Sequence, residues 1–394
     1  MHASIAVVFA SISCLAIVWP VLPFQAIALG GSPQTVTALF AVDTVMMLLV
    51  ASFWGHLSDR IGRKPVVLLG LALAVPAYLL MATATSLEML FASRIVAGLG
   101  GATLPVLQAY IADRTTTDQR VSGMAGFNGA YGLAFVIGPL ITNRMSGPDG
   151  GDYHGVAYTA LVFALLAFCL AAIVLRREPR SAPQDTRDTV RFHWSIYKPL
   201  FGTLCFIPLV GILAVGFVYA ELDATIGLWS DMQLGWDARQ LSIVYALGGI
   251  AAVVTQLVLV TRLSRWFDEG VVAAAAVAAI LGAFACFVVV PGSASTGVAM
   301  VLFGAGVATA NTCLISLISK AVADDVQGSV IGATYSALSV TWILGPLWGG
   351  FSLETFGPDW PFITGGMLLA AALVLLSRLP RAVPVVSGVQ QAAE

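Results

Sequence analysis

Three ionisable side chains are the best placed to do chemistry, because each interrupts a long apolar run: Asp43, Arg94 and Glu221. A charge is costly to hold away from water, so such a residue normally faces a partner or a polar cavity. A carboxylate in that setting can exchange a proton or bind a cation. A permanent cation beside it can hold an anion or influence the proton exchange. The pattern therefore indicates proton exchange and binding of a small molecule inside the apolar runs.

The depth of each residue in its apolar run indicates which role it can take. Asp43 lies about 14 residues from the basic end of its run, which is roughly 20 Å along a helix. Arg94 lies at a similar depth in its own run. A coupled pair and a purely structural ion pair are the two interpretations of Asp43 and Arg94. Glu221 is interpreted either as a second proton or cation site or as a residue at the wet rim, and we expect Asp223 at that rim.

Composition identifies the class of protein that must hold these residues. Of 394 residues, 58% are hydrophobic and only 10% are charged, whereas soluble domains have about 25% charged residues. We therefore predict an all-α integral membrane protein with twelve transmembrane helices, since about 20 apolar residues span a bilayer. The segment from Trp19 to Pro23, with two prolines, is expected to kink or end the first helix. The predicted spans are 4–24, 33–55, 64–85, 88–111, 121–145, 155–175, 199–226, 239–261, 269–291, 294–320, 327–351 and 360–378.

Basic residues predict the orientation. If the chain begins in the cytoplasm, all 19 Lys and Arg residues except Arg94, Arg144 and Arg239 fall at cytoplasmic connections, where membrane proteins concentrate them. We therefore expect a multi-pass protein of the inner (plasma) membrane, with both termini cytoplasmic. The net charge of −2 offers no basic surface for nucleic acid. We expect the lipid bilayer, protons and a small-molecule substrate as partners, and a monomer.

The chain divides into two related halves. The long polar segment 176–198 predicts a cytoplasmic linker between an N-terminal six-helix bundle, 1–175, and a C-terminal bundle with a short cytoplasmic tail, 199–394. Gly138-Pro139 recurs as Gly345-Pro346, 207 residues later. Such a repeat predicts two pseudo-symmetric bundles with the functional site between them.

Other residues within the spans complete the candidate site. Polar and aromatic side chains there suit amphipathic substrates, although interhelical hydrogen bonding or packing is the alternative for each. Pro139 and Pro346 are expected to bend their helices. The five cysteines are isolated, so we expect no metal site. The sequence shows no phosphate-binding loop, paired histidines or Ser/His/Asp arrangement, so we expect no cofactor and no enzymatic activity. The candidate substrate-binding residues are Asp43, Gln108, Asn128, Tyr131, Tyr245, Gln256, Asn311 and Trp342.

The loop between the second and third spans is dense in charge and glycine. It reads Gly55-His-Leu-Ser-Asp-Arg-Ile-Gly-Arg-Lys-Pro65. A carboxylate at a helix end can accept hydrogen bonds from the first turn of another helix. Asp59 could therefore hold the end of another helix, and the alternative is a set of charges that anchors the loop at the lipid headgroups.

This loop resembles the signature of the major facilitator superfamily, in particular its twelve-helix drug:proton antiporters, with the tetracycline-efflux proteins similar to this chain. Arg94-Ile-Val-Ala-Gly98 resembles the motif of the fourth helix, and Gly235-Trp236 resembles the tetracycline-efflux group. The resemblance implies the two-bundle fold, alternating access and a cytoplasmic gate in which Asp59 is the latch and binds the start of the eleventh helix, near Gln327-Gly328-Ser329. The cytoplasmic gate residues that the resemblance implies are Gly55, Asp59, Arg60, Gly62, Arg63, Asp113 and Arg120.

Several positions depart from the pattern of the efflux group. Ala134 stands where a glycine is usual, Thr142-Asn143 replace Gly-Gly, and Ser11 replaces an aspartate. These departures weigh against tetracycline itself. We predict a proton-coupled secondary transporter that exports amphipathic small molecules or drugs. The two alternatives are a proton-coupled or facilitated importer of a nutrient or metabolite, and a membrane sensor that transports nothing.

Overall fold

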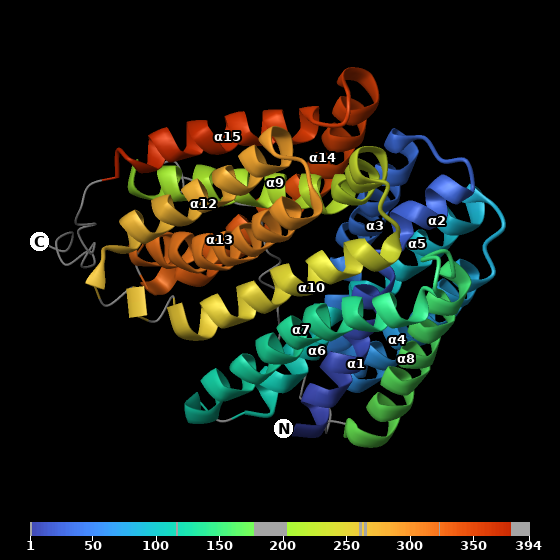
Figure 1. The fold of residues 1–394 in the computed structure, drawn as a ribbon. Coiled ribbons are helices and arrows are strands. Elements are labelled where there is room, and N and C mark those ends of the chain that lie inside the picture. The colour runs from blue at the N-terminus through green and yellow to red at the C-terminus, as the bar shows by residue number, and fades with distance from the viewer. Residues whose placement is uncertain are drawn as a thin grey trace, which may run out of the picture. The chain divides into compact units, whose positions relative to one another are not determined.

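The computed structural model describes residues 2–115, 117–176, 203–259, 262–263, 266–322 and 324–379. Within these ranges every regular element is a helix (Figure 1). The expected linker, apart from Arg176, and the end of the tail lie outside the described residues. The elements are α1 His2–Val18, α2 Leu22–Ala28, α3 Pro33–Ile61, α4 Arg63–Ala82, α5 Leu87–Gly101, α6 Leu104–Asp113, α7 Thr117–Met145, α8 Tyr153–Val174, α9 Thr203–Leu234, α10 Ala238–Val254, the π-helical turn η3 Thr255–Leu259, α12 Glu269–Val289, α13 Ser293–Lys320, α14 Asp324–Phe356 and α15 Trp360–Leu376.

The helices agree with the twelve predicted spans. Eleven apolar stretches of the described residues are long enough to cross a membrane, and a shorter apolar helix of 17 residues, α15, accounts for the twelfth. Apolar side chains such as Leu49 and Ile173 are exposed on the helices, as a surface in contact with lipid requires. The largest difference lies in the seventh span, which was predicted to end at 226 and continues to Leu234.

Two of the spans are broken. The first is interrupted at Trp19–Val21, between α1 and α2, which confirms the break predicted from the prolines. The fourth is interrupted between α5 and α6, a break that was not predicted. Pro105 occupies the first turn of α6, where its missing N–H leaves no hydrogen bond unmade. Each of these spans therefore consists of two helical segments.

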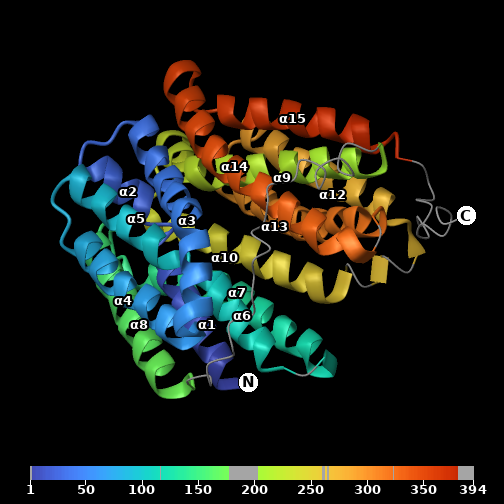
Figure 2. The ribbon, with the colours of Figure 1, turned by 180° about the vertical axis from the view of Figure 1, so that it is seen from behind.

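The chain forms two compact units, and each is described by itself. The first comprises residues 1–187, 223–249 and 346–358. In it α1 packs against α7 and α8, and α4 packs against α5 and α8 (Figures 1 and 2). Gly138 permits the approach of α7 to α1, because a Cβ there would lie 2.5 Å from the Cβ of Ala16. Thr142 strengthens this contact by donating to the carbonyl of Ile17.

The second unit comprises residues 188–222, 250–345 and 359–394. Its α12 lies alongside α13 and α15 (Figures 1 and 2). Rings fill the space between these helices: the centroid of Phe284 lies 5.7 Å from that of Phe362 and 6.2 Å from that of Phe303. A Cβ on Gly345 of α14 would lie 2.8 Å from the carbonyl oxygen of Phe217, so glycine lets α14 approach α9. Small and aromatic residues therefore allow the helices of this unit to pack closely.

Candidate functional site

Asp43 lies on α3 where that helix meets α5. The two helices approach closely because Gly98 has no side chain: a Cβ there would lie 2.4 Å from the carbonyl oxygen of Asp43. Trp54, further along α3, donates through Nε1 to the carbonyl of Leu99 at 2.8 Å. The glycine and the indole together fix the register of α3 against α5, and α5 carries Arg94.

The guanidinium of Arg94 is fully buried. Its Nη2 donates to Ser93 Oγ at 3.1 Å and approaches the sulfur of Met81 at 3.6 Å. The ring of Tyr78 lies 5.8 Å from Cζ. Among the described residues, Nε and Nη1 of Arg94 and Oδ1 of Asp43 have no hydrogen-bond partner. Such buried, unpaired polar atoms are rare and point to a functional role.

Arg94 and Asp43 lie on the packed helices α5 and α3 without forming an ion pair. Within the described residues, no ion pair joins the two side chains. A structural pair would saturate both groups with each other. The geometry instead leaves each with polar atoms that a proton or a small ligand can engage.

Glu221 is fully buried in the second unit. Thr364 of α15 donates to its Oε1 at 3.5 Å. A Cβ on Gly365 would lie 2.8 Å from Oε2 and 2.5 Å from the ring of Phe284. Of the two interpretations left open for Glu221, the wet rim does not fit this burial. The carboxylate lies instead beside Gly365 and Thr364 in the interior of the unit, where a buried carboxyl group can bind a cation or a transferable proton.

The prediction that Asp223 lies at the wet rim is wrong. Its side chain is buried, and it accepts a hydrogen bond from Trp19 Nε1 at 2.5 Å and one from the hydroxyl of Tyr245 at 2.9 Å. The error followed from ending the seventh span too early. The apolar and small residues 224–230 continue the helix and carry Asp223 into its interior. The apolar composition of residues 224–230 could have shown that Asp223 lies inside the span rather than at its end.

Four of the predicted substrate-binding residues of the first unit lie on α6, α7 and α10. Gln108 and Asn128 are exposed, and Gln108 contacts the sulfur of Met124. Tyr131 stacks on Phe135 with 5.2 Å between the ring centroids. Gln108, Asn128 and Tyr131 thus come from two neighbouring helices, α6 and α7. Tyr245 lies on α10, where its hydroxyl donates a hydrogen bond to the carboxylate of Asp223.

The predicted substrate-binding residues of the second unit are Gln256, Asn311 and Trp342. Gln256 donates to Thr312 Oγ1 at 3.3 Å, beside the half-buried Asn311. The ring of Trp342 lies 5.3 Å from that of Tyr219. Gln256 and Asn311 therefore lie close together, whereas Trp342 belongs to the aromatic cluster around α9.

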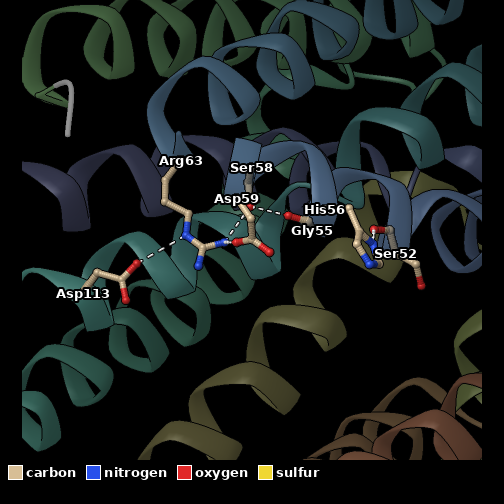
Figure 3. Close-up of polar contacts among 7 residues, drawn as sticks. All are labelled: Ser52, Gly55, His56, Ser58, Asp59, Arg63 and Asp113. Atoms are coloured by element: carbon tan, nitrogen blue, oxygen red, sulfur yellow. Dashed lines mark hydrogen bonds and ion pairs between the residues drawn. The ribbon is translucent and has the colours of Figure 1, made fainter. Parts of the chain in front are cut away.

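Arg63 is the centre of the charged loop (Figure 3). Its guanidinium pairs with Asp59 at 2.9 Å and with Asp113 at 3.3 Å, and it donates to Ser58 Oγ at 2.6 Å. The backbone φ of Gly62 is +93°, a conformation that other residues adopt only with strain. Gly62 thus turns the chain between α3 and α4 so that Arg63 reaches both carboxylates.

The remaining predicted gate residues take less part in this network. Gly55 lies within α3 with open space around it, and Arg60 is exposed. The side chain of Arg120 lies outside the described part of the chain. The prolines predicted to bend their helices, Pro139 and Pro346, lie inside the continuous helices α7 and α14.

Comparison with known proteins adds to this geometry. Residues 4–346 match the model of the Major Facilitator Superfamily. The chain is 27% identical over 366 residues to multidrug resistance protein 1 of Bacillus subtilis, covering 92% of this chain and 91% of that protein. It is 30% identical over 315 residues to the class C tetracycline resistance protein of Escherichia coli, covering 78% of this chain and 77% of that one.

Solved structures share the fold. The nucleoside transporter NupG superimposes with a TM-score of 0.77 at 14% sequence identity, covering 96% of this chain and 98% of the other. The human organic anion transporter MFSD10 superimposes with a TM-score of 0.66 at 19% identity, covering 95% and 98%. The predicted all-α membrane fold is confirmed.

Proposed function

Because the chain belongs to the Major Facilitator Superfamily, we propose that it exports amphipathic small molecules from the cell by proton-coupled alternating access. Similar proteins along nearly the whole chain are named for multidrug and tetracycline resistance, which supports an exporter of drug-like compounds. The observation that carries the proposal is the buried pair on α3 and α5, where Asp43 and Arg94 keep polar atoms without a protein partner among the described residues.

Each residue has a distinct role in this proposal. Asp43 takes up a proton from outside and releases it inside, and its charged form favours substrate. Arg94 supplies a fixed positive charge that can hold an anion or influence the proton exchange. Glu221 is a second carboxylate that exchanges a proton or holds a cationic substrate. The exposed polar residues Gln108 and Asn128 contact the substrate from the first unit.

The two halves of the repeat would move against each other during transport, exposing the substrate to one side of the membrane at a time. The Arg63 network belongs to the cytoplasmic gate of this cycle. Its ion pairs are partly exposed, so they are weak enough to break in each turnover. The protein acts as a monomer in the inner membrane, with both termini in the cytoplasm.

Proton release from purified protein tests this proposal. Amphipathic cations, tetracyclines and small acids are added in turn to detergent-solubilised protein, and the pH of a weakly buffered solution is recorded. We expect one class of compound to release protons from the wild type and not from Asp43→Asn. Glu88→Gln, which removes an exposed carboxylate from the first turn of α5, is the matched control and should behave as the wild type does.

The alternatives predict other results. Binding without proton release in the wild type would contradict antiport, and uptake of the bound compound into cells would then establish an importer. The same release from Asp43→Asn as from the wild type would remove Asp43 from the coupling mechanism. The absence of both binding and flux for every compound would favour a sensor that transports nothing.

A further inference from the structure

The end of α14 contacts the beginning of α3 in the first unit. Glu354, in the last turn of α14, accepts a hydrogen bond from the backbone N–H of Gln34 at 2.9 Å. Gln34 occupies the first turn of α3, where backbone N–H groups lack partners within the helix. The positive end of the helix dipole also favours a carboxylate there. Glu354 therefore caps a helix that lies 320 residues away in the sequence.

The backbones of α14 and α3 pack closely next to this hydrogen bond. A Cβ on Gly350 would lie 3.0 Å from the Cα of Gln34 and would clash with Thr37 Oγ1. Thr37 is fully buried, whereas Glu354 and Gln34 are exposed. The contact thus has a dry interior at Gly350 and a polar, water-accessible rim at Glu354. Water competes for both groups of an exposed hydrogen bond, so its net contribution is modest and it can be broken and remade during a transport cycle.

Further contacts of the first unit join the two sequence halves at the same end. Asn143, near the end of α7, donates to the carbonyl of Arg239 at 3.0 Å, and Arg239 donates to the carbonyl of Pro148 at 3.0 Å. Gly150 lies directly against Asp237. The connections involved are the first, fifth, seventh and eleventh between spans, so a chain that crosses the membrane at each span places all of them on one face.

The Asp59–Arg63 loop lies on the other face, because it is the second connection. Gln34 and Asp59 belong to the same continuous helix, α3. The rise of an α-helix separates the two residues by roughly 38 Å. Both ends of α3 thus carry polar contacts, one at each face. An alternating-access cycle must open the Glu354 end at one stage, since substrate cannot otherwise pass that face.

We propose that Glu354, bound to the first turn of α3 and backed by the Gly350–Thr37 contact, is the latch that closes the face opposite the Asp59 loop. This inference rests on the proposed transport function. Removing the carboxylate weakens the closed state of this face. Adding a Cβ at position 350 prevents α14 and α3 from approaching closely enough to reach the closed state.

Reactivity of an introduced cysteine measures this opening. Ala41 is buried and lies one turn after Thr37, on the same face of α3, so Ala41→Cys is shielded while the latch is closed. Purified protein in lipid nanodiscs exposes both faces to a water-soluble maleimide, which makes the result independent of membrane orientation. Mass spectrometry of the peptide that contains position 41 separates its labelling from that of the native cysteines.

We expect Glu354→Ala to raise the labelling rate of Ala41→Cys between about two- and tenfold, the range given by the net contribution of one hydrogen bond. Glu354→Gln, whose side chain can still accept the hydrogen bond, should raise it less. Gly350→Ala should raise the labelling rate as well. Adding Thr37→Ala to the Gly350→Ala protein should partly reverse this rise, because it removes Oγ1, the atom nearest to the new Cβ.

Two controls keep the result interpretable. Ala167→Cys lies fully buried on α8, away from α14, and its labelling should not change. An equal rise at Ala167→Cys would overturn the latch, because it would indicate general loosening. So would unchanged labelling of Ala41→Cys in Glu354→Ala and Gly350→Ala. If Ala41→Cys responds as expected while no compound releases protons from the wild type, the latch stands and the export proposal fails.

Discussion

A hydrogen bond to a buried carboxylate contributes more stability than one to a neutral carbonyl, because the charge strengthens the bond in a medium of low polarity. The first unit contains both kinds, each donated by an indole. Trp19 donates to the carboxylate of Asp223, and Trp54 donates to the backbone carbonyl of Leu99. Both indoles are buried, so the two sites form a natural comparison.

We expect Trp19→Phe to destabilise the protein by about 1.5–3 kcal/mol and Trp54→Phe by about 0.5–1.5 kcal/mol. Each substitution removes the indole N–H and a similar volume, so the difference reports the nature of the acceptor. Thermal unfolding in detergent, followed by fluorescence of the remaining tryptophans, measures both. Equal losses would mean that Asp223 gains no special stabilisation from Trp19.

The Arg63 network is expected to matter for activity more than for stability. The Arg63–Asp113 pair is partly exposed, with 24% and 49% of the side chains accessible, and such pairs contribute at most about 1 kcal/mol. In a double-mutant cycle of Arg63→Gln and Asp113→Asn, we expect a coupling free energy below that value and a marked loss of drug export by either variant. A large coupling free energy with normal export would indicate a structural pair.

Among helices, close approach depends on a few glycines. Gly98 and Gly101 lie one turn apart on α5, yet only Gly98 meets a backbone. Its Cβ would lie 2.4 Å from the carbonyl oxygen of Asp43, whereas the nearest atom to a Cβ on Gly101 is the flexible sulfur of Met47, 3.8 Å away. The position of the Asp43 carboxyl relative to Arg94 thus follows from one absent methyl group.

We expect Gly98→Ala to lower both thermal stability and export, because α3 must shift away from α5 and carry Asp43 with it. Gly101→Ala is the matched control. It should be neutral or stabilise by about 0.5–1 kcal/mol, since alanine favours the helix. Comparable losses in both variants would show that helix flexibility, rather than close approach, explains the effect.

Hydropathy was sufficient to predict the membrane-spanning helices, but it predicted their ends and breaks less well. Twelve spans followed from runs of about 20 apolar residues, because a bilayer requires that length. The break between α5 and α6 was missed, since the run across Thr103 and Pro105 stays apolar. The contact between Glu354 and Gln34 was also missed, because residues 320 positions apart meet only through tertiary packing. Asp43 and Arg94 were identifiable because intramembrane charges are rare.

At the scale of the whole molecule, the asymmetry of charge bears on the direction of transport. The basic residues of the loops predict which face is cytoplasmic, and proton coupling predicts that the acidic side of the membrane receives the drug. Inside-out vesicles have the cytoplasmic face outward, so export from the cell corresponds to uptake into the vesicle. Proton-driven export therefore requires a pH gradient with the acidic side inside the vesicle.

In inside-out vesicles with an acidic interior, we expect the wild type to accumulate a fluorescent amphipathic cation against its concentration gradient. In the proposed mechanism, each proton leaving the vesicle drives drug inward through the exchange at Asp43. A protonophore should abolish the accumulation, and vesicles with equal pH on both sides should show only equilibration. Asp43→Asn should lose the accumulation, because it lacks the exchangeable proton. Accumulation that survives the protonophore, or that requires an alkaline interior, would contradict proton-driven export and favour an importer working in the opposite sense.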